Sequence, residues 1–215
     1  MSLVQAIITE NFVLVGADKK GIRLDGTIFC DFNKIIKLNK NIIIGCTGIV
    51  SDVLRLFEGY CNYSEEKGLF YSNNDIDISY NEFVNIINHR FKIIQKDHNS
   101  NNSTRKYNIG CLICGYNNTE FEYTTYNLGG SNGSPEGIFK ATKAPNFPYK
   151  GVNEGKIFHV ETLQRLVEDA YFKYGNLTMR QYKNILLEVF NEGAKIDDTI
   201  NNIVCFESIR KVDLV

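Results

Sequence analysis

The spacing of apolar residues predicts a β-rich start to the chain. Residues 3–8 and 12–17 are apolar runs separated by the polar residues 9–11, and residues 34–38 and 41–46 form two further short runs. Apolar and β-branched runs of this length, bounded by polar turns, are typical of strands. We therefore expect four strands within the first 46 residues.

From residue 50 the apolar period becomes that of a helix. One helical stripe consists of Val50, Leu54, Phe57 and Cys61. A second helix begins at Ser79, because Glu82 three residues later completes a capping box. The polar run 98–104 then predicts a loop. Two consecutive helices are therefore expected after the first strands.

The second half of the chain repeats this order. Residues 108–116, 120–126 and 137–143 have the pattern of strands. A helical stripe follows at Leu163, Leu166, Val167, Ala170 and Tyr174. Gly175 ends this helix, Thr178 with Gln181 caps another one, and residues 202–208 form a last strand.

The order of these elements predicts the fold class. Helices that come in adjacent pairs, rather than alternating with strands, do not build a doubly wound parallel sheet. Two sheets stacked between two helical layers would bury every apolar face. We therefore expect an α+β protein with a four-layer αββα sandwich.

Length and charge limit the classes of function. At 215 residues with 43% hydrophobic content, the chain suits one domain over residues 1–215. The formal net charge of −1 gives no basic field for nucleic acid or anionic lipid. No apolar run approaches the roughly 18 to 20 residues of a membrane span, and no signal-like segment opens the chain. We expect a cytoplasmic protein without membrane or nucleic-acid partners.

Cysteine and histidine spacing does not predict a metal site. Cys111 and Cys114 have the spacing of half a zinc or redox site, but a second half is missing. Both cysteines fall in a predicted strand, where an offset of three residues points them to opposite faces. His89 falls in a helical pattern, His98 in the polar loop and His159 at the start of a helix. We expect buried, inert thiols and no metal or other cofactor.

Three short motifs share one register and carry a resemblance. VGADKK places Asp18 at the end of the second predicted strand, and NKIIKL places Lys34 before an apolar pair. CTGIVSD places Gly48 and Asp52 where the first helix begins. With these motifs, residues 2–54 resemble the start of a proteasome β-type subunit, in particular the bacterial proteasome-like proteins. NIGCLICGYNNTEFEYTTYNLGG is similar to the central hairpin of that family.

The resemblance implies an N-terminal-nucleophile hydrolase. The mature chain of that family begins with a threonine nucleophile, and Ser2 takes this position here once Met1 is removed. A terminal α-amine has a pKa of about 7.7 to 8.0, so it can act as the base for its own hydroxyl. Lys34 would stabilise the developing alkoxide, and Asp18 would hold Lys34 charged. The N–H of Gly48 would face the oxyanion of the acyl transfer.

The resemblance also implies a first specificity pocket. In this sequence its positions are Gly21, Phe32, Cys46 and Val50. These residues are uncharged and mostly apolar, which indicates a preference for an apolar side chain before the cleaved bond.

The second half departs from the family pattern. Where the family has a Gly-Ser-Gly turn and an Asp-x-x-Ser-Gly-Gly loop, this chain has KATKAPNFPYKG and EGAKIDDTINN. Asp197, Asp198 and Thr199 are the candidates for the supporting residues of that loop. The insertion 145–155 either caps the active-site cleft or forms a surface loop, and the surface loop is the favoured interpretation.

Two functions remain open from the sequence. The first is a hydrolase of peptide or amide bonds that assembles with copies of itself, as the resemblance implies. The second is a non-catalytic proteasome-like subunit that acts as a scaffold or partner-binding module, which retention of Met1 would favour. An ATPase that unfolds substrates would be a separate chain, since nothing in the sequence encodes one.

Overall fold

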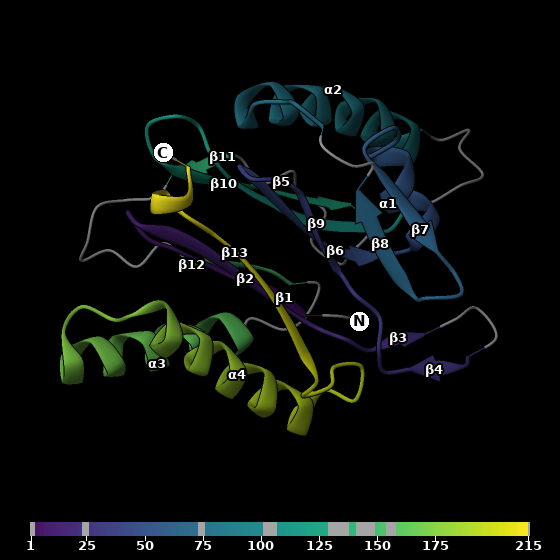
Figure 1. The fold of residues 1–215 in the computed structure, drawn as a ribbon. Helices are drawn as coiled ribbons and strands as arrows, with labels where there is room; N and C mark the ends of the chain where they lie inside the picture. Colours follow the sequence, from purple (N-terminus) through teal and green to yellow (C-terminus); the bar gives the residue numbers. More distant parts are fainter. Residues whose placement is uncertain are drawn as a thin grey trace.

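Two stacked β-sheets lie between two layers of helices (Figure 1). The computed structural model describes residues 3–22, 26–72, 76–100, 107–128, 138–140, 149–153 and 158–214. One sheet has four strands in the order β12 (Tyr149–Asn153), β1 (Leu3–Ile8), β2 (Phe12–Asp18) and β13 (Val204–Arg210). The other has five, in the order β11 (Ile138–Lys140), β10 (Phe121–Leu128), β9 (Ile109–Tyr116), β6 (Ile42–Gly48) and β5 (Ile35–Asn39).

Four helices cover the outer faces of the sheets within the described residues. α1 (Val50–Leu56) and α2 (Tyr80–Asn99) lie on the five-stranded sheet, while α3 (Phe158–Tyr174) and α4 (Met179–Ile196) lie on the four-stranded sheet (Figure 1). Two small hairpins, β3 (Gly21–Ile22) with β4 (Ile28–Phe29) and β7 (Cys61–Ser64) with β8 (Leu69–Ser72), extend from the first half of the chain. The short 3₁₀ helix η1 (Lys211–Asp213) follows β13. This arrangement confirms the predicted αββα sandwich.

Three apolar cores hold the four layers together. The core between the sheets includes Val4, Val15 and Leu112, and the core beneath α3 and α4 includes Leu3 and Leu14. The third core joins α1 and α2 to the five-stranded sheet. Because β1 and β2 are buried on both faces, they appear in the sequence as continuous apolar runs rather than alternating ones.

The predicted helix ends are largely confirmed. Ser79 accepts a hydrogen bond from the backbone N–H of Glu82 over 3.3 Å at the start of α2. Thr178 and Gln181 form a reciprocal capping box at the start of α4. Gly175 follows α3 with φ of 72°, a left-handed conformation that glycine adopts at little cost.

Two predictions in the helical part of the first half are wrong. The helical stripe does not reach Cys61, because α1 ends at Leu56 and a turn containing Gly59, with φ of 82°, leads into strand β7. His98 lies in the last turn of α2 rather than in a loop. Cys61 pairs with Ser72 in the β7–β8 hairpin, and His98 Nδ1 accepts from the backbone N–H of Tyr107 over 3.0 Å, and neither contact is indicated by the local sequence pattern.

The favoured interpretation of the insertion 145–155 is also wrong for residues 149–153. These residues form the edge strand β12, which pairs antiparallel with β1, from Leu3 opposite Asn153 to Ile7 opposite Tyr149. The remaining insertion residues, 145–148 and 154–155, lie outside the described residues.

The other strands agree with the predictions to within about two residues at each end, and residues 137 and 141–143 of a predicted strand lie outside the described residues.

Among the described helices, none combines the length and the apolar composition needed to cross a membrane.

Candidate active site around Asp18 and Lys34

A buried ion pair lies at the end of β2. Lys34 Nζ is 2.7 Å from Asp18 Oδ1, and the two side chains are 2% and 0% exposed. Burial lowers the pKa of Lys34, while the charge of Asp18 and its hydrogen bond act in the opposite direction. Buried charges are tolerated in proteins when they are paired, so Asp18 compensates for the burial of the lysine.

Backbone amides hold the Asp18 carboxylate from two further directions. The N–H of Leu3 donates to Oδ1 over 2.7 Å, and the N–H of Lys20 donates to Oδ2 over 3.0 Å. Charge-assisted hydrogen bonds of this kind offset part of the cost of burying a carboxylate. A strand that is buried on both faces can therefore end on a charged residue.

The predicted nucleophile, Ser2, lies outside the described residues. Leu3, which follows Ser2 directly in the chain, is the residue whose amide contacts Asp18. The start of the described chain is thus attached to the same carboxylate that pairs with Lys34.

Lys34 keeps unused hydrogen-bonding capacity. An ammonium group has three donors, and Asp18 is 2.7 Å from it. Nζ is fully buried and, apart from this ion pair, has no acceptor in good hydrogen-bond geometry among the described residues. The main chain of Lys34 is held to β6, because the N–H of Cys46 donates to its carbonyl over 2.8 Å.

Gly48, the last residue of β6, has a backbone conformation that favours glycine. Its φ is 99°, and a Cβ atom there would lie 2.4 Å from the carbonyl oxygen of Asn108. The same carbonyl accepts from Ile49 N over 2.9 Å, and Asn108 N donates to the buried carboxylate of Asp52 over 2.9 Å. The motif CTGIVSD therefore supplies both this glycine and the carboxylate of Asp52, which holds the neighbouring segment of the chain at Asn108.

Three of the four predicted pocket residues belong to one apolar cluster. Phe32 is 7% exposed and packs against the ring of Phe70, with the ring centroids 5.6 Å apart. Cys46 is buried, which raises its pKa, and Val50 packs against the same core. Gly21 begins strand β3 and is partly exposed. Their role in binding substrate stays a prediction.

The loop between α4 and β13 contacts the turn that follows Asp18. The N–H of Lys19 donates to Asn201 Oδ1 over 3.0 Å and to the carbonyl of Ile203 over 2.9 Å. Lys20 Nζ contacts the carbonyl of Asp198. This loop, residues 197–203, overlaps the C-terminal part of EGAKIDDTINN, the segment that contains the predicted supporting residues, and Asn201 was not among those predicted.

Asp197 and Thr199 contact one another within this loop. The backbone N–H of Thr199 donates to Asp197 Oδ1 over 2.9 Å, and its hydroxyl donates to the same oxygen. Among the three candidates, Asp198 contributes a backbone carbonyl to the turn after Asp18. Their catalytic role stays a prediction.

Cys111 and Cys114 lie on opposite faces of β9, as predicted. Cys111 belongs to the core beneath α1 and α2, and Cys114 belongs to the core between the sheets. Burial raises the pKa of both thiols, which keeps them protonated and poor as ligands or nucleophiles. The part of the chain that the structure describes contains no group of three or more His, Cys, Asp or Glu residues placed to hold a metal ion.

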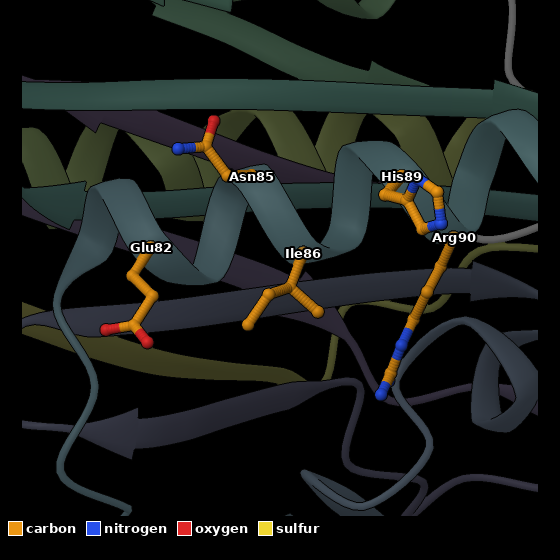
Figure 2. A pocket seen from close by; sticks show the side chains of 5 residues that line it. All are labelled: Glu82, Asn85, Ile86, His89 and Arg90. Atoms are coloured by element: carbon orange, nitrogen blue, oxygen red, sulfur yellow. The ribbon is translucent and has the colours of Figure 1, made fainter.

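A separate hollow of about 610 Å³ lies on the surface of α2. Figure 2 shows its side chains projecting from that one helix: Glu82, Asn85, Ile86, His89 and Arg90. The guanidinium of Arg90 donates hydrogen bonds to the backbone carbonyls of Leu56 and Glu58. None of these residues was predicted to belong to the site.

Comparison with known proteins supports the resemblance of the motifs. A crystal structure of eukaryotic HslV from Trypanosoma brucei matches with a TM-score of 0.61 and 13% sequence identity, covering 97% of this chain and 99% of that chain. At this identity the likeness shows the fold alone, the αββα sandwich described above. No curated protein sequence matches the chain. A sequence model of the proteasome subunit family matches residues 3–138, more than half of the 215 residues, and the chain therefore belongs to that family.

Proposed function

We propose that this protein is a peptidase whose nucleophile is the hydroxyl of Ser2, exposed by removal of Met1. Membership of the proteasome subunit family supports a peptidase-type function in general. The observation that carries the finer proposal is the buried Asp18–Lys34 pair, together with the hydrogen bond from Leu3 N to Asp18. Lys34 Nζ and Leu3 N both contact Asp18 Oδ1, so the ammonium of Lys34 lies close to the residue that follows the proposed nucleophile.

The proposed reaction proceeds through an acyl-enzyme. The terminal amine of Ser2 takes the proton of the hydroxyl as the oxygen attacks the peptide carbonyl. The Lys34 ammonium stabilises the negative charge on the attacking oxygen, and the N–H of Gly48 stabilises the oxyanion. The amine then gives its proton to the leaving amino group. In the second half, the amine takes a proton from water as the water oxygen attacks the acyl carbonyl, and it returns that proton to the Ser2 oxygen as the ester bond breaks.

Serine is chemically sufficient for this role. It carries the same hydroxyl as threonine and lacks only the γ-methyl group, while the terminal amine is common to both. Lys34 Nζ has donors that no described residue accepts apart from Asp18, and these donors fit a hydroxyl oxygen as acceptor. The mechanism needs no histidine and no cofactor.

The natural setting follows from the same proposal. The substrate would be a peptide with an apolar residue before the cleaved bond, recognised at Gly21, Phe32, Cys46 and Val50. We propose that the protein acts in the cytoplasm as a homo-oligomer, and that any ATPase that feeds it is a separate chain.

Processing of the N-terminus tests the proposal. Intact-mass measurement of untagged protein is expected to show loss of Met1. An epoxyketone peptide probe, which reacts with both the hydroxyl and the adjacent amine, is expected to label Ser2 in the processed protein only. Ser2→Ala is the matched control, because it permits removal of Met1 but has no hydroxyl to react.

Two outcomes would contradict the peptidase proposal. One is an untagged protein that keeps Met1 and still assembles normally. The other is a processed protein that neither reacts with the probe nor cleaves peptides. Either result would favour the scaffold function, with the Asp18–Lys34 pair serving only as a structural ion pair.

A further inference from the structure

Asn33, the residue before Lys34, joins several segments of the chain. Its backbone N–H donates to the carbonyl of Gly68 over 3.1 Å, and its carbonyl accepts from Phe70 N over 3.5 Å, which ties it to the β7–β8 hairpin. Its side-chain Oδ1 accepts from the N–H of Ile35 over 3.1 Å, across the backbone of Lys34. The main chain that carries Lys34 is thus fixed by the Asn33 carboxamide.

A thiol from the other sheet contacts the same carboxamide. Cys205 lies on β13 opposite Ala17 of β2. Its Sγ is 3.3 Å from Asn33 Oδ1 and 3.5 Å from the carbonyl oxygen of Ala17. Burial raises the pKa of Cys205, which keeps it a protonated donor.

These contacts meet at the two residues that precede the ion pair. Ala17 comes directly before Asp18, and Asn33 comes directly before Lys34. One thiol therefore lies between the backbone of β2 and the side chain that fixes the start of β5, and its single proton is shared between these two acceptors. The lengths of 3.3 and 3.5 Å are suitable for a donor with sulfur, which is larger than nitrogen or oxygen.

We propose that the Asn33 carboxamide and the Cys205 thiol are positioning groups that hold Lys34 against Asp18 for catalysis. Neither group acts on substrate; each acts through Lys34. This inference rests on the proposed function, because it assigns the two groups a purpose in that reaction. A catalytic side chain has to be held within about 0.5 Å of its productive position, and a flexible lysine stem does not achieve this alone.

The groups that face Lys34 define how its titration should respond. They are Asp18 from β2, Cys205 from β13 and Lys20 from the turn after β2. If Asn33→Ala loosens the contact with Asp18, the lysine stays buried with a weaker partner and its pKa falls further. Asn33→Asp keeps the acceptor oxygen and adds a negative charge, so the pKa of Lys34 rises.

The test compares substitutions at both positions with a matched control. Asn33→Ala and Cys205→Ala remove the contacts, while Asn33→Asp and Cys205→Ser preserve an acceptor and a donor. Asn39→Ala is the control. The side-chain Oδ1 of Asn39 also accepts a hydrogen bond from the backbone N–H two residues later, that of Asn41, over 2.8 Å, but Asn39 lies at the far end of β5. Thermal unfolding of each variant reports any general loss of stability.

The readouts are peptide cleavage and the NMR titration of the ε-methylene carbon of Lys34. Asn33→Ala is expected to lower kcat about tenfold with little change in KM, and to move the lysine titration to lower pH. Asn33→Asp is expected to move it to higher pH. Cys205→Ser should resemble the wild type more closely than Cys205→Ala, and Asn39→Ala should leave the titration unchanged.

The NMR titration separates failure of this inference from failure of the proposed function. If the wild type cleaves no peptide, a shift of the lysine titration to lower pH in Asn33→Ala, absent in Asn39→Ala, still supports the positioning role. If Asn33→Ala does not fold, Asn33→Asp and the two Cys205 variants decide. The inference is overturned if the lysine titration and kcat are unchanged in the folded Asn33 and Cys205 variants, or if Asn39→Ala changes them equally.

Discussion

Substitutions in the Asp18–Lys34 ion pair should affect the stability of the protein and its activity differently. Both side chains are almost completely buried and their charged atoms are 2.7 Å apart. Removing one partner of a buried ion pair costs about 3 to 5 kcal/mol, because the other charge remains without compensation. Replacing both partners with uncharged side chains avoids this penalty. The three variants are Lys34→Met, Asp18→Asn and the double variant.

The surrounding contacts set the expected order of the costs. In Lys34→Met, the Asp18 carboxylate keeps the N–H donors of Leu3 and Lys20, so the loss should be near 3 kcal/mol, the lower end of that range. In Asp18→Asn, the buried ammonium loses its partner and one of these N–H groups loses its acceptor, so the loss should be about 4 to 5 kcal/mol. The double variant should lose only about 1 to 2 kcal/mol, since no charge is left unpaired.

The assay is urea unfolding of the four proteins at pH 7 and one fixed protein concentration, with peptide cleavage measured in parallel. We expect the double variant to recover most of the lost stability but to have a turnover about two to three orders of magnitude below the wild type, like each single variant. Additive stability losses would show that the two groups are not coupled. Full turnover in the double variant would refute a catalytic role for Lys34.

Three further predictions follow from the geometry of the site. Gly48→Ala should lower turnover at least about tenfold and lower the free energy of unfolding by about 1 to 2 kcal/mol. The reason is that φ at this position is 99° and a Cβ atom would clash with Asn108 O. Unchanged kinetics and an unchanged urea midpoint would contradict this prediction. Because the pKa of Lys34 is lowered in the folded protein, the unfolded chain binds more protons than the folded one between that lowered pKa and 10.5. The free energy of unfolding of the wild type, relative to that of Lys34→Met, should therefore rise with pH in this window. Urea unfolding from pH 7 to 10 measures this difference, and a flat difference would refute the reasoning. A peptide-library scan should show an apolar preference before the cleaved bond, and a dominant basic or acidic preference would overturn the assignment of the pocket.

Sequence periodicity was most informative where neighbouring residues determine the structure. The strands β1 and β2 are buried on both faces, so their apolar runs were unambiguous. Ser79 and Thr178 marked the starts of α2 and α4, because a cap depends only on residues within one turn. The four layers followed from the order of the elements, since paired helices have to cover two sheets.

Periodicity alone did not determine the site. Asp18 and Lys34 are 16 positions apart, and their roles came from the resemblance of three motifs to a known family rather than from spacing. The contact of Asn201 with Lys19 spans 182 positions, and that of Cys205 with Asn33 spans 172. No local pattern indicates such partners, because they meet only when β13 pairs with β2.

The sequence by itself determined the burial pattern, the helix caps and the register of the motifs, because each depends on neighbouring side chains. Only the tertiary structure decided that residues 149–153 pair with β1, because that partner is distant in the sequence, and that Cys61 begins a strand, which pairs with β8 of the same small hairpin. The same is true of the ion pair. A carboxylate and an ammonium are compatible with burial only in contact with each other, and folding brings them within 2.7 Å.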